Sequence, residues 1–243
     1  IELYSGSVSA IRATNVRYFN FNMYGGKIDA SQDSQDYGVW VNKSSIVSTI
    51  NIYGGEITAA NSAFYVMGAG DSVLNIYGGT ITALNNAEVP YGVYFPGVGT
   101  LNMSGGTIAS AHTGIMAPGT AKINISGTAN VHGTYNGIVL GNEPARRGSK
   151  LTITGSPTIS SDAIAIKMYD TVNIQDSPTI TGRVNSVKNT NSNPSVPYPM
   201  FQLTGPLSNA TPISINVTVP NIVVAAGWSG HMGDKLTTDA IAN

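Results

Sequence analysis

The stretch that decides the fold is Leu74 to Ala83, LNIYGGTITA, in which apolar and polar residues alternate on both sides of a Gly-Gly pair. Alternation with a period of two is typical of a half-buried β-strand, so we expect Leu74 and Ile76 to face a core. The two glycines interrupt the strand where the chain must bend sharply, because glycine accepts backbone angles that other residues avoid. Ile81 then points inward from a second short strand.

The same ten-residue phrase occurs repeatedly along the chain. Clear copies are Phe21 to Ala30 (FNMYGGKIDA), Ile50 to Ala59 (INIYGGEITA) and Leu101 to Ser110 (LNMSGGTIAS). With weaker copies, the phrases begin at residues 1, 21, 50, 74, 101, 123, 151 and 172, so successive copies start 20 to 29 residues apart. Self-similarity at such a period indicates one supersecondary unit stacked on itself.

A third apolar segment follows most copies of the phrase. Its examples are YGVWVN (Tyr37 to Asn42), AFYVMG (Ala63 to Gly68), YGVYFP (Tyr91 to Pro96), TGIMAP (Thr113 to Pro118), NGIVLG (Asn136 to Gly141) and DAIAIK (Asp162 to Lys167). Three strands per repeat without helical periodicity predict an all-β fold, a right-handed parallel β-helix of about eight coils. Each strand should pair with its equivalent one coil above and below.

The repeats end near residue 184, which sets the expected organisation of the chain. We predict β-helix repeats over residues 1–184, followed over 185–243 by an irregular crossing and a C-terminal β cap of the same domain. Asn185 to Pro199 is rich in Asn, Ser and Pro, and two apolar runs follow it. A cap is expected because an open solenoid end exposes unpaired backbone groups.

The composition limits the classes of partner and of site that are expected for this chain. Only 10% of the residues are charged and the net charge is −1, so no basic patch for nucleic acid is expected. No apolar run reaches the length of a membrane span, and the absence of cysteine excludes disulfides and thiolate metal sites. We predict no cofactor and no metal ion, and the oligomeric state stays open. Because the chain opens at Ile1, we expect a leader or other domains to be missing from it.

Stacking turns each position of the phrase into a column along the rod. The second position is mostly asparagine, and stacked asparagine side chains can pass amide hydrogen bonds from coil to coil. We therefore expect a structural ladder. Its members are Asn22, Asn51, Asn75, Asn102, Asn124 and Asn173.

Two further columns are aromatic and are the candidates for ligand binding. The fourth phrase position carries Tyr4, Tyr24, Tyr53 and Tyr77, which should form an outward stack that either stabilises the rod or supports a sugar ring. The third segment carries Trp40, Tyr65 and Tyr94, and then Met116, Val139 and Ala165. An exposed apolar column of this length is either covered by loops of the same chain or is a docking face for a partner or a glycan.

The sequence shows little sign of catalytic chemistry. Glycoside hydrolysis needs two carboxyl groups held close together, and the acids here are scattered. Asp162, Asp170 and Asp176, at coil bends, are the weak candidates for an acid pair. Arg146, Arg147 and Lys150 could supply charge to a lyase, but no acidic trio accompanies them. The histidines His112, His132 and His231 are expected to be solvated loop residues without a metal.

The recurring phrase, together with the Gly-Val-aromatic third segment, resembles the β-helix repeat regions of large secreted or wall-attached surface proteins of gut-type bacteria. The tail from Phe201 to Trp228 looks like the segment that follows such repeats. The resemblance implies an extracellular or cell-surface location in a bacterium and offers no catalytic positions. Pectate-lyase-like enzymes share the general scaffold, but their acidic and basic site clusters do not occur here.

We therefore expect a non-catalytic surface module of adhesin type that binds glycans or a host surface. One alternative is a carbohydrate-active enzyme, a polysaccharide lyase or a glycoside hydrolase, with its site near Asp162 to Asp176 or in the loop Glu143 to Lys150. The other alternative is a purely structural stalk that has no ligand.

Overall fold

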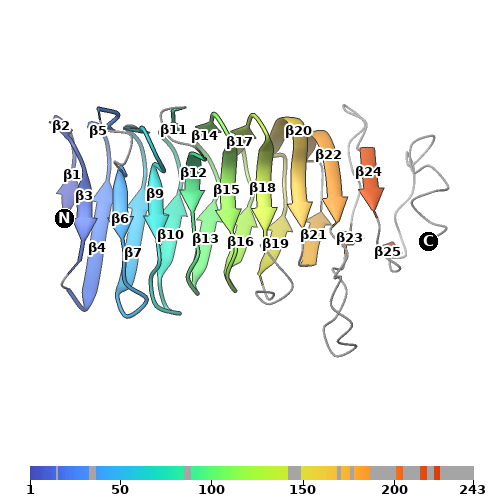
Figure 1. Cartoon of the computed structure of the whole chain (residues 1–243), viewed down its shortest axis with the longest axis horizontal. Coiled ribbons are helices and arrows are strands. Elements are labelled where there is room, and N and C mark those ends of the chain that lie inside the picture. Colours follow the sequence, from blue (N-terminus) through green and yellow to red (C-terminus); the bar gives the residue numbers. More distant parts are fainter. Residues whose placement is uncertain are drawn as a thin grey trace.

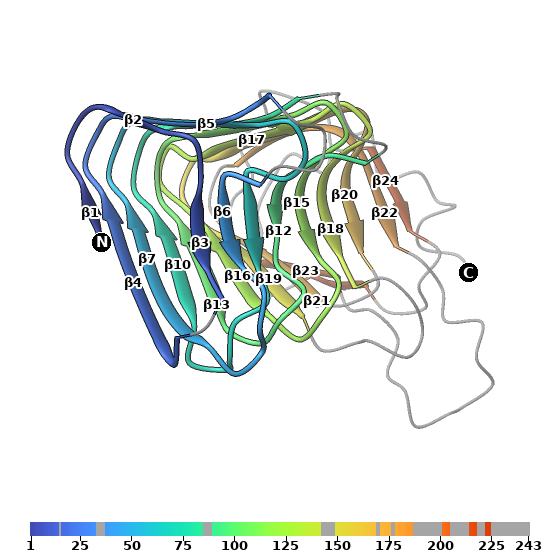
Figure 2. The ribbon, with the colours of Figure 1, turned by 60° about the vertical axis from the view of Figure 1, so that its left-hand side comes forward.

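The chain forms a right-handed parallel β-helix, seen in the computed structural model as a rod of stacked coils (Figure 1). The structure describes residues 1–14, 16–32, 37–84, 89–141, 149–168, 171–175, 178–186, 201–204, 214–217 and 222–224. These residues form strands, turns and connections without a helix. The predicted fold class is therefore confirmed, and Figure 2 shows how each coil winds through its successive strands.

The first strands of the coils form one continuous parallel sheet. Each pairs in register with its equivalent in the next coil, so that Leu74, for example, lies between Ile50 and Leu101. In order along the rod the strands are β1 (Glu2–Leu3), β4 (Tyr18–Met23), β7 (Val47–Ile52), β10 (Val73–Ile76), β13 (Thr100–Met103), β16 (Lys122–Ile125), β19 (Lys150–Ile153), β21 (Thr171–Gln175), β23 (Phe201–Thr204) and β25 (Ile222–Val224).

The second and third strands form the other two sides of the coils. The second strands are β2 (Ser7–Val8), β5 (Lys27–Ala30), β8 (Glu56–Ala59), β11 (Thr80–Ala83), β14 (Thr107–Ser110) and β17 (Asn130–Gly133). The third strands are β3 (Ile11–Ala13), β6 (Val39–Val41), β9 (Phe64–Val66), β12 (Tyr91–Tyr94), β15 (Thr113–Ala117) and β18 (Asn136–Leu140).

Coils 1 to 6 thus have three separate strands, whereas the next two coils do not. There, one long strand takes the place of the second and third strands: β20 (Thr158–Met168) in coil 7 and β22 (Thr179–Ser186) in coil 8. The register of β20 against β22 shifts between Ser160 and Ile164 and again between Ile164 and Ile166. This irregularity lets one strand serve two sides of a coil.

Stacking continues into the segment for which the sequence predicts a cap. Strand β23 pairs parallel with β21, β25 pairs parallel with β23, and β24 (Ser214–Val217) pairs parallel with β22. The rest of the predicted crossing and cap lies outside the described residues. Within the described part, these three strands extend the sheets of the β-helix.

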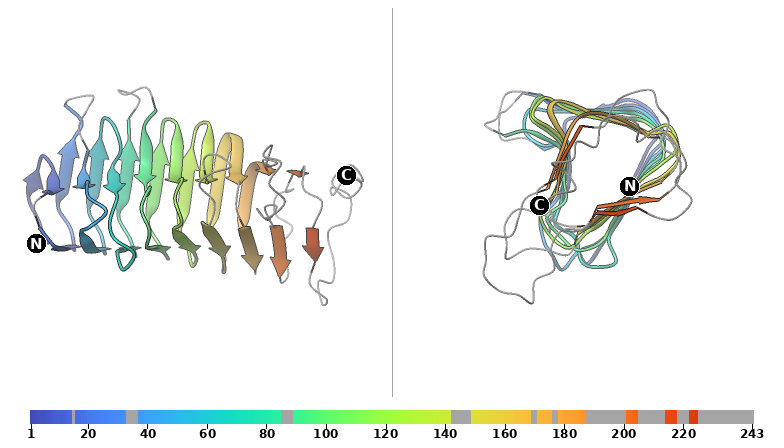
Figure 3. Two further views of the ribbon diagram at one scale, coloured as in Figure 1. Left: turned by 60° about the horizontal axis from the view of Figure 1, so that its bottom comes forward. Right: turned by 90° about the vertical axis from the view of Figure 1, so that its right-hand side faces the viewer.

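The core is a set of aligned apolar columns inside the rod. Leu74, Ile76 and Ile81 are fully buried, as the alternation in the phrase predicts, and their equivalents in neighbouring coils are buried with them. The coils superimpose when the rod is viewed along its axis (Figure 3). Each side chain therefore packs on its own equivalents, and burial of one Leu or Ile contributes about 1.5–3 kcal/mol to the free energy of folding.

The Gly-Gly pair makes the bend between the first and second strands. Gly79 has a φ of +86°, a conformation that residues with a side chain adopt only with strain. A Cβ atom at Gly78 would lie 2.5 Å from the carbonyl oxygen of Tyr53 in the preceding coil. Both glycines are therefore required by the stacking of one bend on the next.

Candidate functional site

The asparagine column is a chain of side-chain hydrogen bonds on the first-strand face. Asn51 Nδ2 donates to Asn22 Oδ1, Asn75 to Asn51, Asn102 to Asn75 and Asn124 to Asn102, each at 2.8 Å. Thr152 then occupies the column, and Asn173 follows it in register in coil 8. Because their amides are engaged with one another, these residues are suited to holding coils together rather than to gripping a ligand.

The tyrosine ladder, which comprises Tyr4, Tyr24, Tyr53 and Tyr77, lies at the bends that follow the first strands. Ring centroids are 4.7 Å apart between Tyr4 and Tyr24 and 5.0 Å apart in the next two pairs, with interplanar angles of 8°, 5° and 13°. The residues are 43–64% exposed. Near-parallel stacking places ring face against ring face. The ladder thus offers solvent mainly ring edges and hydroxyl groups, an unfavourable platform for the flat face of a sugar.

A second aromatic surface lies on the third-strand face, where a column of small residues lets neighbouring coils approach closely. A Cβ atom at Gly38 would lie 2.7 Å from the carbonyl oxygen of Ala63, and one at Gly92 would lie 2.6 Å from that of Gly114. Glycine is needed here because the start of the third strand passes directly over its neighbour in the next coil. This close approach positions the aromatic residues that flank each glycine.

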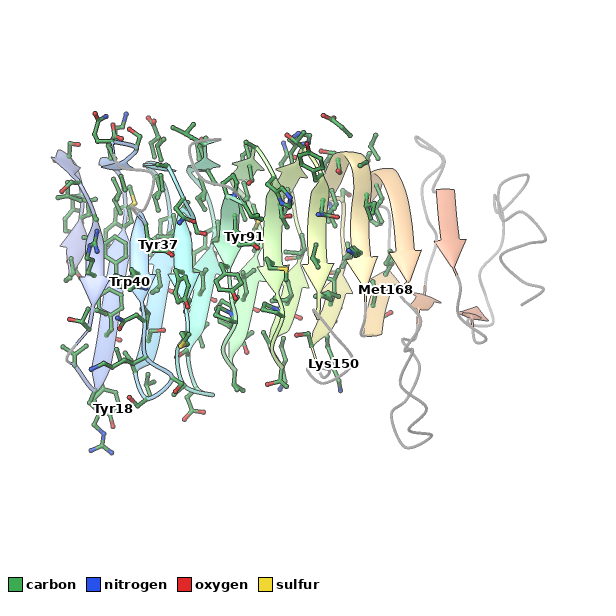
Figure 4. The ribbon with its side chains drawn as sticks, in the orientation of Figure 1. Tyr18, Tyr37, Trp40, Tyr91, Lys150 and Met168 are labelled. Carbon is green, nitrogen blue, oxygen red and sulfur yellow. The ribbon has the colours of Figure 1, made fainter. Side chains whose placement is uncertain are left out.

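We call this surface the aromatic stripe. Its members come from coils 2 to 6, and all are half-buried except Tyr135, which is exposed. In Figure 4 the labelled members Tyr37, Trp40 and Tyr91 lie on the face turned toward the viewer. The full set is Tyr37, Trp40, Tyr65, Tyr91, Tyr94, His112 and Tyr135.

The rings of the stripe contact one another at varied angles. Tyr37 lies nearly parallel to Trp40, with centroids 5.6 Å apart, and meets Tyr65 edge-on at 5.2 Å. Tyr65 leans on Tyr94 at 5.1 Å with an interplanar angle of 56°, and Tyr94 lies nearly parallel to Tyr91 at 5.1 Å. Tilted and edge-on contacts leave parts of ring faces uncovered, in contrast to a regular stack.

His112 continues the stripe toward coil 6. Its ring lies 4.9 Å from that of Tyr135, and its Nδ1 is 2.8 Å from Thr113 Oγ1. Burial lowers the pKa of His112, because the charged imidazolium loses hydration there. The expectation of a solvated loop residue is wrong for His112, since it packs between Tyr91 and Tyr135.

The other two histidines lie elsewhere. His132 belongs to β17, where it is half-buried and its Nδ1 is 3.0 Å from Ser160 Oγ, so it is a strand residue rather than a solvated loop residue. His231 lies outside the described residues.

The column that contains Trp40, Tyr65 and Tyr94 differs from the prediction at both ends. Arg12 precedes it, with its guanidinium 5.3 Å from the Trp40 ring centroid. Met116 and Val139 do follow in register, but they are only 8% and 6% exposed. Strand β20 aligns Lys167 with Val139, so the next member of the column is Lys167 rather than the predicted Ala165. Ala165 is fully buried. The predicted exposed column is therefore confined to its aromatic half.

The structure describes only one of the three acidic candidates. Asp162 is exposed on β20, and Asp170 and Asp176 lie outside the described residues. Residues 142–148, which include Arg146 and Arg147, also lie outside them, and Lys150 is an exposed residue at the start of β19.

One cluster of charged residues is not apparent from the sequence pattern. Lys27 Nζ lies 3.2 Å from Asp29 Oδ2 and 3.4 Å from Glu56 Oε1, because Lys27 and Glu56 are paired across coils. A hydrogen bond from the Ser31 hydroxyl, and the neighbouring Lys27, lower the pKa of Asp29. Asp29 is thus ionised at neutral pH and is unsuited to act as the general acid of a glycosidase.

The described residues contain no group of three or more His, Cys, Asp or Glu side chains that could hold a metal ion. The described part also contains no helix able to span a bilayer.

Comparisons with known proteins give no relative for this chain. No family model matches it, and neither the curated proteins nor the solved structures match it. The resemblance to bacterial surface proteins therefore stays a prediction from the sequence.

Proposed function

We propose that this chain is a non-catalytic, extracellular bacterial surface module of adhesin type that binds glycan chains along the aromatic stripe. The observation that carries this proposal is the unbroken series of ring contacts from Trp40 to Tyr135. These contacts cross five consecutive coils, a length of about 19 Å at the spacing of parallel strands. A surface of that length suits an extended chain of sugars rather than a single ring.

The chemistry of the stripe matches a carbohydrate. Sugar rings present apolar C–H faces, which pack on aromatic rings, and hydroxyl groups, which need hydrogen-bond partners. The tyrosine hydroxyl groups of the stripe supply such partners. So does Nε2 of His112, on the opposite side of the imidazole from the nitrogen that meets Thr113. The low content of charged residues, 10% of the chain, favours a neutral glycan over an acidic one.

Binding without turnover is favoured by the placement of the acids. The cluster of Asp29 and Glu56 is held by Lys27 on the second strands, away from the third-strand stripe. This separation of the Lys27 cluster from the stripe supports a binding surface over a hydrolase or a lyase.

A glycan array tests this proposal with two variants from the same coil. Tyr65→Ala removes the ring at the centre of the stripe, and Tyr53→Ala removes a tyrosine of the ladder as the matched control. We expect the wild-type chain to bind a subset of glycans, Tyr65→Ala to lose that binding and Tyr53→Ala to keep it. Melting temperatures show that both variants are folded.

The other outcomes assign the chain to another class. Retained binding in both Tyr65→Ala and Trp40→Ala would overturn the stripe as the site. Release of reducing sugars or of unsaturated products from the bound glycan would indicate a carbohydrate-active enzyme instead. Absence of binding to any glycan would indicate a structural stalk. Labelling of intact source cells with an antibody to this chain tests the proposed location.

A further inference from the structure

The tyrosine ladder has exposed phenol rings held in contact, and glycan binding does not use them. Each ring of the ladder comes from a different coil, and each is 4.7–5.0 Å from the next. Phenol rings readily lose one electron and one proton, and two phenoxyl radicals that meet form a carbon–carbon bond. The ladder therefore places reactive groups where coupling requires only a local rotation of side chains.

The first member of the ladder also has a proton acceptor. The Tyr4 hydroxyl donates a hydrogen bond to Glu2 Oε2 at a distance of 2.7 Å. Loss of an electron from a phenol makes its hydroxyl strongly acidic, so a carboxylate already hydrogen-bonded to it can take the proton as the electron leaves. Tyr4 is also the most exposed member, at 64%. Both features favour Tyr4 as the position of first oxidation.

We propose that the tyrosine ladder is an oxidative coupling site at which a peroxidase-type one-electron oxidant joins Tyr4 to Tyr24 as dityrosine. Each ring gives up one electron and its hydroxyl proton, and the two radicals form a bond between ring carbons ortho to the oxygens. Each of these carbons then loses its hydrogen as a proton, which restores the two hydroxyl groups. Overall, the two tyrosines lose two hydrogens and one hydrogen peroxide becomes two waters. The new bond ties the first coil to the second.

Proximity makes this coupling intramolecular. Reactants held at contact distance react far faster than the same groups free in solution. Two other exposed tyrosines lack this arrangement among the described residues: Tyr18 packs beside the Arg17 guanidinium, and Tyr135 packs on His112. The stripe also contains tyrosine pairs, but apart from Tyr135 its tyrosines are half-buried, whereas the ladder tyrosines are 43–64% exposed and meet an oxidant more readily.

Peptide mapping after treatment of the dilute chain with horseradish peroxidase and hydrogen peroxide tests this site. Trypsin cuts after Arg12, Arg17 and Lys27, so Tyr4 and Tyr24 fall in separate peptides. We expect the monomer fraction to contain the peptide ending at Arg12 joined to peptide 18–27, lighter by two hydrogens and fluorescent as dityrosine. Fragmentation should locate the link at Tyr24.

Conservative variants test whether the cross-link forms at the ladder or at a neighbouring tyrosine. Tyr24→Phe keeps the ring stack and should lose the linked pair, whereas Tyr18→Phe, in the same peptide, should keep it. Glu2→Gln should slow the coupling, and an unchanged rate would overturn the carboxylate as proton acceptor. A link through Tyr18, or links found only in covalent dimers or only among stripe tyrosines, would overturn the coupling site. Melting temperatures establish that each variant is folded.

Discussion

The tyrosine ladder and the aromatic stripe are two rows of aromatic residues on one rod, and they present different surfaces. In the ladder, one tyrosine per coil occupies the same position, and the rings stack within 13° of parallel. In the stripe, coils 2 and 4 each contribute two rings, three residues apart, and coil 3 contributes Tyr65 between them. Strict repetition thus covers ring faces, whereas the uneven number of rings per coil prevents one regular stack.

We expect the largest loss of stability from a substitution that crowds the backbone beneath the aromatic stripe. Gly92→Ala would place a Cβ atom against the Ile108 side chain and 2.6 Å from the carbonyl oxygen of Gly114. We expect a loss of about 3 kcal/mol in the free energy of unfolding, from overpacking next to the core. Chemical denaturation measures this loss. Gly70→Ala is the control: its Cβ would meet only Val98, at 3.6 Å, so a comparable loss there would contradict the steric explanation.

Removal of one ring from the middle of the ladder should cost less. Tyr53→Ala removes two stacked pairs, and we expect a loss of about 2 kcal/mol, at about 1 kcal/mol for each pair. Tyr4→Ala removes only one pair and should cost about half as much by that estimate. Thermal unfolding of the two variants gives the comparison. Equal losses would show that the rings do not stabilise the rod through their stacking.

The asparagine column lies beside the ladder on the same face. Substitutions in it test whether side-chain hydrogen bonds between coils stabilise the rod as the stacked rings do. Asn75→Ala removes two side-chain hydrogen bonds, one to Asn51 and one from Asn102, and should cost about 1 kcal/mol. Asn124→Ala removes the single bond to Asn102 found there and should cost less. The two melting temperatures decide this. A larger loss for Asn124→Ala would contradict a ladder of additive bonds.

The smallest effect we expect is a pH dependence of stability that arises from His112 in the stripe. Burial lowers the pKa of His112 in the folded chain, so the unfolded chain binds the proton more tightly. Stability should therefore fall as the pH drops below about 6.5, the ordinary pKa of histidine, and should be restored above it. Melting temperatures between pH 7 and 5 measure this, with His112→Gln as the comparison. The same pH slope in His112→Gln would assign the effect to another group.

The aromatic rows also show where prediction from sequence worked and where it did not. The positions of Tyr4, Tyr24, Tyr53 and Tyr77 in the phrase were enough to predict an outward stack, because parallel pairing in register makes equal positions neighbours. The third segment lacked such a strict phrase. Alignment of the segment that begins at Asp162 with the other third segments predicts Ala165 in this column, whereas Lys167, two residues further on, lies there. No feature of the sequence predicts the irregularities in β20 that allow this register.

Contacts between charged side chains are a second feature that the phrase does not reveal. Lys27 contacts Glu56, at the same phrase position one coil away, and Asp29, two residues along its own strand, so one lysine joins two acids that are scattered in the sequence. His112 likewise seemed an isolated residue before a strand, and only its contacts with Tyr91 and Tyr135 make it part of the stripe. The predicted acidic site near Asp170 and Asp176 lies outside the described residues and stays a prediction.

The sequence by itself determined the coil, the direction of stacking and the inward and outward faces, because these follow from a period of two and a repeated phrase read locally. Only the tertiary structure decided how the aromatic rings meet, which of them keep an uncovered surface, and which charged groups come together. The physical reason is that ring angles and ion pairs depend on distances between coils. Residues about one coil apart in the chain become contacts there, and their geometry is set by packing rather than by local pattern.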